Sequence, residues 1–149
     1  MKRLLFFLIP VTMMIGCTKT EKPNPFFVEW NTPFGSPPFH LIEEGHYLPA
    51  YEEGIRQHQA EIDAIINNAE EPTFENTIVA YDQSGELLNK VGMVFGGLRS
   101  ANTSDSLQAI AKITTPMLTV HYNSIRLNQD LFAKIKDRKS TRLNSSHTI

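Results

Sequence analysis

The chain has 149 residues, of which 41% are hydrophobic and 20% are charged, with a formal net charge of −2. This length and composition suit one globular domain. A net charge so close to zero, with no basic stripe along the chain, argues against a nucleic-acid partner. The single cysteine, Cys17, excludes a disulfide framework within this chain.

The first sixteen residues have the features of a secretory signal peptide. Met1, Lys2 and Arg3 form a short basic start, and residues 4–15 form an apolar run, LLFFLIPVTMMI. Twelve helical residues, at about 1.5 Å each, are too short for a bilayer core of about 30 Å. We therefore interpret residues 1–16 as a signal peptide, with a buried N-terminal element as the alternative.

The signal peptide is followed by a motif that resembles the lipobox of bacterial lipoproteins, Met-Ile-Gly-Cys at residues 14–17. The cysteine is required in that motif because its thiolate is the nucleophile that receives the lipid, and several acyl chains on one residue give stable anchoring. We predict lipidation of Cys17 and an exported protein, anchored to a bacterial membrane on the periplasmic side of the outer membrane or at the cell surface. The alternative is a chance cysteine after an ordinary signal peptide.

Residues 17–38 are expected to form a proline-rich and aromatic-rich extended tether. Its five prolines favour extended and polyproline II backbone. The aromatic residues in and just after it are too apolar for a free linker, so we expect their rings to lie buried across a helical body: Phe26, Phe27, Trp30, Phe34 and Phe39. A peptide-binding surface is the alternative reading of the same residues.

Residues 39–136 predict an all-α fold, an up-and-down antiparallel array of helices joined by short connections. The first helix begins near His46 and ends around Asn67 and Asn68. Residues 72–103 predict one long buried helix, to which the rest of the chain packs. Thr73 and Asn76 form its capping box.

Two further helices are predicted after this one. The third starts at Thr103 or Ser104, and Pro116 is expected to kink or split it. Its inward face is expected to hold Leu107, Ile110, Ile113, Met117 and Val120, with Leu118 buried beside them. Asn128 caps a short fourth helix, whose apolar residues are Leu131, Phe132 and Ile135.

No catalytic motif occurs anywhere in these 149 residues. There is no H-E-x-x-H, H-x-x-E-H, G-x-S-x-G, P-loop or G-x-G-x-x-G. His58 and Glu61 share a helix face, and we interpret them as a solvated polar pair. The acidic residues near the start of the first helix indicate a solvated face rather than a metal site. We therefore assign no catalytic and no metal-binding residue to this chain.

Residues 137–149 differ in character from the rest of the chain. The run DRKSTRLNSSH resembles the translation of a common sequencing adapter, so we interpret residues 137–149 as an adapter-derived tail that breaks off the fourth helix without a cap. A natural basic tail is the alternative. Without the signal peptide and this tail, nine basic and fifteen acidic residues remain, a net charge of −6. On this interpretation the natural reading frame continues beyond Lys136.

Residues 24–136 resemble the N-terminal region of the M3 family of zinc metallopeptidases, in its peptidyl-dipeptidase Dcp branch. The matching segments, in chain order, are NPFF (24–27), PPF (37–39), YLPAYEEG (47–54), PTFENT (72–77), MVF (93–95) and SANT (100–103).

The resemblance implies an all-helical, two-lobed enzyme with a channel between its lobes. It further implies a zinc ion held by an H-E-x-x-H helix downstream of these residues, and release of dipeptides from the C-terminus of short peptides. This chain by itself is then catalytically inactive. It walls the channel, restricts substrate size and has the remainder of the peptidase as its partner. The alternative is a free-standing helical lipoprotein that acts as a scaffold or peptide-binding module.

Overall fold

The computed structural model describes residues 23–145, with side chains for residues 23–137. The signal peptide and Cys17 therefore lie outside the described residues. Within those residues the fold is all-α, without strands, as predicted. No helix in the described part of the chain is long and apolar enough to cross a membrane.

The central element is α1 (Tyr47–Ile66), which follows a 3₁₀ turn at Glu44–His46. It contacts each of the other α-helices, and its most extensive contact is with α3 (Glu86–Ala101). The two helices approach closely at Gly54, where an added Cβ would lie 3.0 Å from the Cα of Leu88. The prediction that residues 72–103 organise the fold was wrong, because α1 occupies the middle of the assembly.

The predicted long helix over residues 72–103 is broken. The capping box of Thr73 and Asn76 is present, and it opens a π-helical turn at Phe74–Val79, followed by α2 (Ala80–Gln83). The backbone is extended at Ser84 and left-handed at Gly85, with φ of 75°. Glycine allows this because it has no Cβ to clash with the following carbonyl. Helix α3 starts immediately afterwards and ends at Ala101, close to the predicted end.

Helix α4 (Asp105–Arg126) is capped by Ser104 and runs unbroken through Pro116, so the predicted split does not occur. Pro116 lies on the exposed side, where water can satisfy the carbonyl that loses its partner. Helix α5 (Gln129–Ser145) is capped by Asn128, as predicted. It extends past Lys136, so the prediction that the helix breaks off there was wrong; the origin of the tail remains a prediction.

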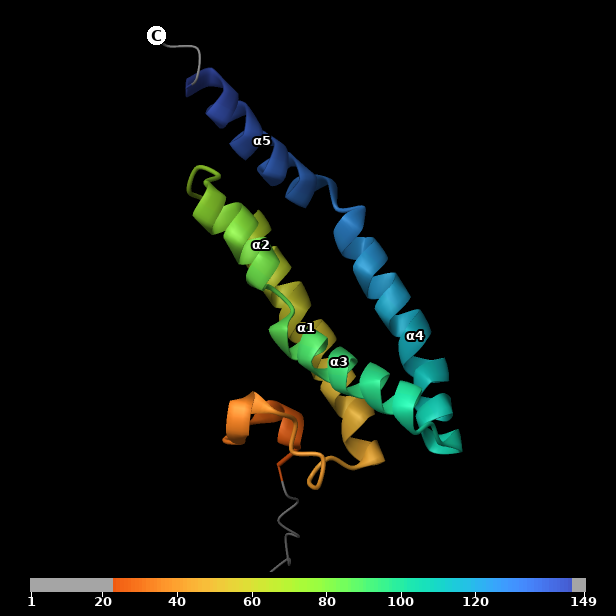
Figure 1. Ribbon diagram of the computed structural model, residues 1–149. Helices are drawn as coiled ribbons and strands as arrows, with labels where there is room; N and C mark the ends of the chain where they lie inside the picture. The colour runs from red at the N-terminus through yellow and green to blue at the C-terminus, as the bar shows by residue number, and fades with distance from the viewer. Residues whose placement is uncertain (1–22, 146–149) are drawn as a thin grey trace, which may run out of the picture.

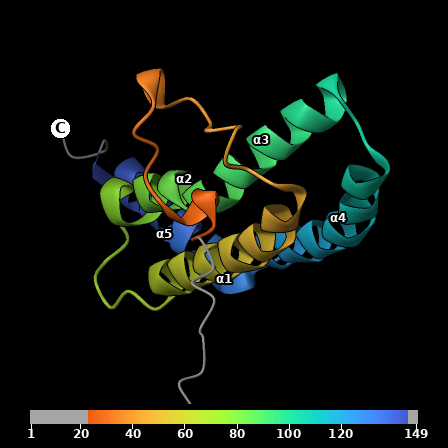
Figure 2. The same ribbon diagram turned by 90° about the horizontal axis from the view of Figure 1, so that it is seen from below.

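Figure 1 shows how these elements are arranged. Helix α1, the segment from α2 to α3, and α4 run alternately up and down, and α5 continues in the direction of α4. The N-terminal segment lies at the opposite end of the molecule from α5. Figure 2 looks from that end and shows α1 and α4 side by side, consistent with their direct contact.

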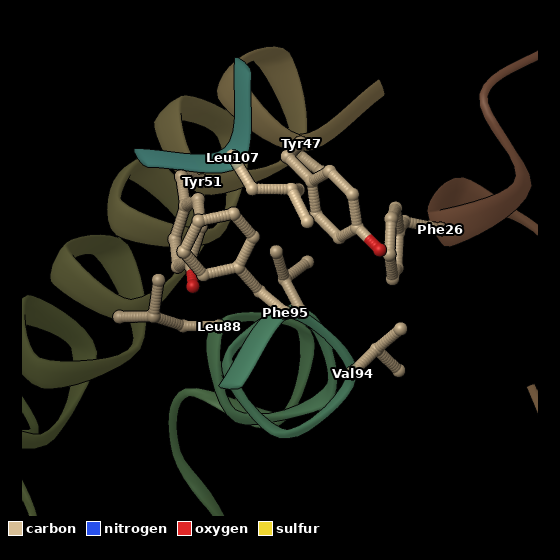
Figure 3. Packing of buried hydrophobic residues seen from close by; sticks show 9 residues of the cluster. Phe26, Tyr47, Tyr51, Leu88, Val94, Phe95 and Leu107 are labelled. Atoms are coloured by element: carbon tan, nitrogen blue, oxygen red, sulfur yellow. The ribbon is translucent and has the colours of Figure 1, made fainter. Parts of the chain in front are cut away.

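The main core lies where the N-terminal segment, α1, α3 and the start of α4 meet (Figure 3). Its aromatic rings pack against one another: Tyr47 lies edge to face with Phe95 at 5.0 Å and tilted against Phe26 at 5.5 Å, measured between ring centroids. Such pairs add to the stabilisation that burial provides. The Tyr47 side chain is completely buried, and its hydroxyl has no hydrogen-bond partner among residues 23–137.

The inward face of α4 differs from the prediction in its second half. Leu107 is buried as predicted, but Ile113 and Val120 are exposed, and Thr114 and His121 take the buried positions. In the N-terminal segment, Phe26 is buried and Trp30 is half-buried, whereas Phe27, Phe34 and Phe39 are exposed. The expectation that all five rings are buried was therefore wrong for three of them.

Candidate functional site

Two buried histidines and a buried serine meet at one point in the fold, the break between α2 and α3. His58 from α1, Ser84 from the break and His121 from α4 are each at most 8% exposed. The Nε2 atom of His58 lies 3.2 Å from the Ser84 hydroxyl, and its Nδ1 lies 3.0 Å from Nε2 of His121. We call these three residues the Ser–His–His cluster.

The hydrogen-bond directions in this cluster follow from the serine. The Ser84 hydroxyl donates its proton to the carbonyl oxygen of Tyr81 at 2.7 Å. It must therefore accept from Nε2–H of His58, which leaves Nδ1 of His58 as an acceptor. His121 then donates its Nε2–H to that atom.

This polarity is the reverse of the arrangement that activates a serine nucleophile. An activated serine donates its proton to the neighbouring histidine. Here the serine proton is held by a backbone carbonyl, and the histidine donates to the serine oxygen. The Ser–His–His cluster therefore joins α1, the α2–α3 break and α4, and the polarity of its hydrogen bonds differs from that of a catalytic triad.

Burial keeps both histidines neutral at neutral pH. Desolvation lowers the pKa of His58, and the nearby Glu61 carboxylate opposes that shift. Desolvation also lowers the pKa of His121, and the adjacent His58 lowers it further. A second proton on the His58 ring would occupy Nδ1 and face the Nε2–H of His121, so this hydrogen bond favours the uncharged state of His58.

The carboxylate of Glu61 completes the attachment of the break to α1. Its Oε2 accepts a hydrogen bond of 2.7 Å from the backbone N–H of Gly85, at the N-terminus of α3. A carboxylate there satisfies a free N–H and interacts favourably with the helix dipole. The prediction that His58 and Glu61 form a solvated pair was wrong for His58: both residues hold the Ser84–Gly85 break.

Neither Ser84 nor His121 was predicted from the sequence to belong to a site. A signal for Ser84 was present, since a Ser-Gly dipeptide inside a helical pattern is typical of a turn. His121 lies seven residues after Thr114 and fourteen after Leu107, which places all three on one helix face. That face looked less apolar than the one containing Ile113 and Val120.

A second feature is a groove of about 1150 Å³ between the N-terminal segment and helices α1 and α3. Lys90 fixes the segment there by donating to the carbonyl oxygens of Phe26 and Val28. Its ammonium also lies 4.0 Å from the centroid of the Trp30 ring, a favourable cation–π distance. These contacts explain why the segment packs on the helices although three of its rings stay exposed.

The described side chains do not form a site that fits a zinc ion. Within residues 23–137, no group of three or more histidine, cysteine, aspartate or glutamate side chains is arranged to hold a metal. A zinc site needs at least three protein ligands. Cys17, the predicted lipidation site, lies outside the described residues.

Comparison with known proteins relates the chain to peptidases. No family model matches it. It is 44% identical over 112 residues to the dipeptidyl carboxypeptidase of Escherichia coli K12, and 40% identical over 112 residues to that of Salmonella typhimurium LT2. The alignments cover 75% of this chain and 16% of each relative. The chain thus spans about one sixth of the length of these relatives, and over the aligned residues it belongs to the M3 peptidase family.

Proposed function

We propose that this chain is the N-terminal, non-catalytic part of a zinc-dependent peptidyl-dipeptidase. The observation that carries the proposal is the identity of 44% over 112 residues to a protein named dipeptidyl carboxypeptidase. Release of dipeptides from the C-terminus of short peptides is the activity proposed for the whole protein. The helical residues of this chain contribute a wall that restricts access to the substrate channel.

The zinc ion of the whole protein is proposed to be held by residues outside this chain. The reason is chemical: the 149 residues contain no H-E-x-x-H, and the described side chains bring no three metal ligands together. The His58–His121 pair supplies only two ligand side chains, and their facing ring nitrogens hydrogen-bond to each other.

We further propose that the protein is exported and lipid-anchored. The basic start, the apolar run of residues 4–15 and the lipobox-like residues 14–17 support this part. Labelling with radioactive palmitate in a bacterial host tests it. The label is expected on the intact chain and lost in Cys17→Ser; a Cys17→Ser variant that is labelled equally contradicts the anchor.

Resequencing the gene with long reads across the codon of Lys136 tests the peptidase proposal. The expected result is a frame that continues into an H-E-x-x-H helix in place of the adapter-like tail. The complete protein should then release dipeptides from a peptide with a free C-terminus, lose this activity with a chelator and regain it with zinc. A genuine stop codon directly after the present tail would instead support the free-standing helical lipoprotein.

A further inference from the structure

Helix α4 carries a second apolar stripe that nothing in the described structure covers. Ile113, Pro116 and Val120 follow spacings of three and four residues, which place them on one face of the helix, and Leu127 lies directly after its last residue. Ile113 is 49% exposed, Val120 70% and Leu127 80%. The buried stripe that faces α1, which includes Thr114 and His121, lies on another side of the same helix.

The exposed stripe belongs to a part of α4 without charged residues. From Ile113 to Ile125 the sequence is ITTPMLTVHYNSI, with Lys112 and Arg126 on either side. A helix face that remains in water normally carries charged residues, because Lys, Glu, Arg and Asp are the residues that favour exposure. More than three turns of helix with exposed apolar residues and no charge are typical of a surface that is buried against another protein segment.

The polar residues beside the stripe favour a protein partner over a lipid surface. Thr115, Thr119, Asn123 and Ser124 are exposed, and they flank the apolar positions with hydroxyl and amide groups. Membrane-surface helices instead combine a wide apolar face with lysines and arginines on the other side. No helix in residues 23–145 has the length and hydropathy to cross a bilayer.

We propose that this stripe is the docking face for an uncharged apolar helix from the remainder of the longer polypeptide. The inference rests on the proposed function and specifies which surface of this chain meets the rest of the enzyme. The length of the relatives supports this occupant, because the chain spans only 16% of them. Phe132, at the start of α5 and 66% exposed, adds to the apolar area near the end of the stripe.

The experiment measures the accessibility of a cysteine placed on the stripe. Val120→Cys is introduced into a Cys17→Ser background, both in the 149-residue chain and in the complete protein. Maleimide labelling of the peptide that contains residue 120 is followed by mass spectrometry. Gln108→Cys, at an exposed position on another side of α4, is the matched control.

The expected result is labelling at residue 120 that is slower in the complete protein than in the 149-residue chain by about tenfold or more. Labelling at residue 108 should be equal in the two. Equal labelling at residue 120 in both proteins overturns the proposal. If the complete protein nevertheless releases dipeptides, the proposed function stands and only the docking face is wrong.

Two other outcomes also overturn the proposal. Protection of residue 120 that appears in the 149-residue chain as its concentration rises identifies a second copy of the chain as the occupant. A gene that ends after the present tail removes the proposed occupant altogether, and the proposed function fails with it. Sequencing distinguishes this last outcome from the others.

Discussion

The imidazole ring of His58 lies directly against the backbone of Gly85. An added Cβ at residue 85 would come within 3.0 Å of Nδ1, and the residue has a left-handed φ of 75°. The same ring bonds to Ser84 and His121, so it cannot move away without losing those hydrogen bonds. The close packing of one side chain against one glycine thus fixes where the α2–α3 segment bends over α1.

Replacing this glycine is expected to destabilise the fold. Gly85→Ala forces a Cβ both into an unfavourable backbone conformation and into the His58 ring, at a cost of about 1–3 kcal/mol in the free energy of unfolding. Gly96→Ala is the control, because its Cβ meets nothing within 4 Å. That control should gain about 0.5–1 kcal/mol from the better helix former. Urea unfolding measures both, and a Gly85→Ala variant as stable as the control would contradict the packing described.

The contact between α1 and α3 predicts a similar loss of stability when Gly54 is replaced. A Cβ there would lie 3.0 Å from the Cα of Leu88, a backbone atom that cannot rotate away. Gly54→Ala should therefore push the two helices apart and lower the free energy of unfolding by about 1–3 kcal/mol. Gly92→Ala, in a half-buried part of α3 with no atom within 4 Å, is the matched control and should not be destabilised. Equal melting temperatures of the two variants would rule out the close approach.

The unpartnered hydroxyl of Tyr47 predicts a stabilising substitution. Desolvation raises the pKa of this tyrosine, and in the described part of the chain its hydroxyl has no hydrogen-bond partner. Tyr47→Phe keeps the ring contacts with Phe26 and Phe95 and removes a buried polar atom, so a gain of about 1 kcal/mol is expected. Tyr81→Phe, at a partly exposed position, should change stability by less than about 0.5 kcal/mol. A clear loss of stability in Tyr47→Phe would show that the hydroxyl has a partner.

The two buried histidines predict that stability falls as the solution becomes mildly acidic. Their pKa values are lowered in the folded state, so the unfolded chain binds more protons and stability rises with pH. The two histidines contribute fully to the free energy of unfolding above the unfolded histidine pKa of about 6.5. This contribution is lost as the pH falls from there through their pKa values in the folded state. The pKa of the Glu53 carboxyl is held at about 2, chiefly by its hydrogen bond from Arg56, so this group does not titrate in the same range.

Thermal melts between pH 5.5 and 7.5 check this dependence. The wild-type chain and the control His40→Gln, an exposed histidine, should lose stability together on acidification. The double variant His58→Gln and His121→Gln should show a clearly shallower dependence on pH. The same pH slope in all three proteins would exclude the Ser–His–His cluster as its source.

Features that depend on a few neighbouring residues could be predicted from the sequence. The caps formed by Thr73 with Asn76, by Ser104 and by Asn128 are all present, because a cap needs only a side chain and a backbone N–H two or three residues away. The all-α class follows equally from local periodicity. The resemblance to M3 peptidases, carried by short motifs along the chain, was confirmed by comparison with the dipeptidyl carboxypeptidases.

Which face of a helix is buried was decided only by the tertiary structure. Helix α4 has two stripes of suitable spacing, and the more apolar one, with Ile113 and Val120, is exposed in this chain. The buried stripe contains His121, which can be buried because His58, 63 residues earlier in the chain, accepts its hydrogen bond. In the same way, the bend at Ser84 and Gly85 depends on His58 and Glu61 of another helix. The sequence alone determined the helical class and the caps, and long-range hydrogen bonds decided where the segment 72–103 bends and which side of α4 is buried.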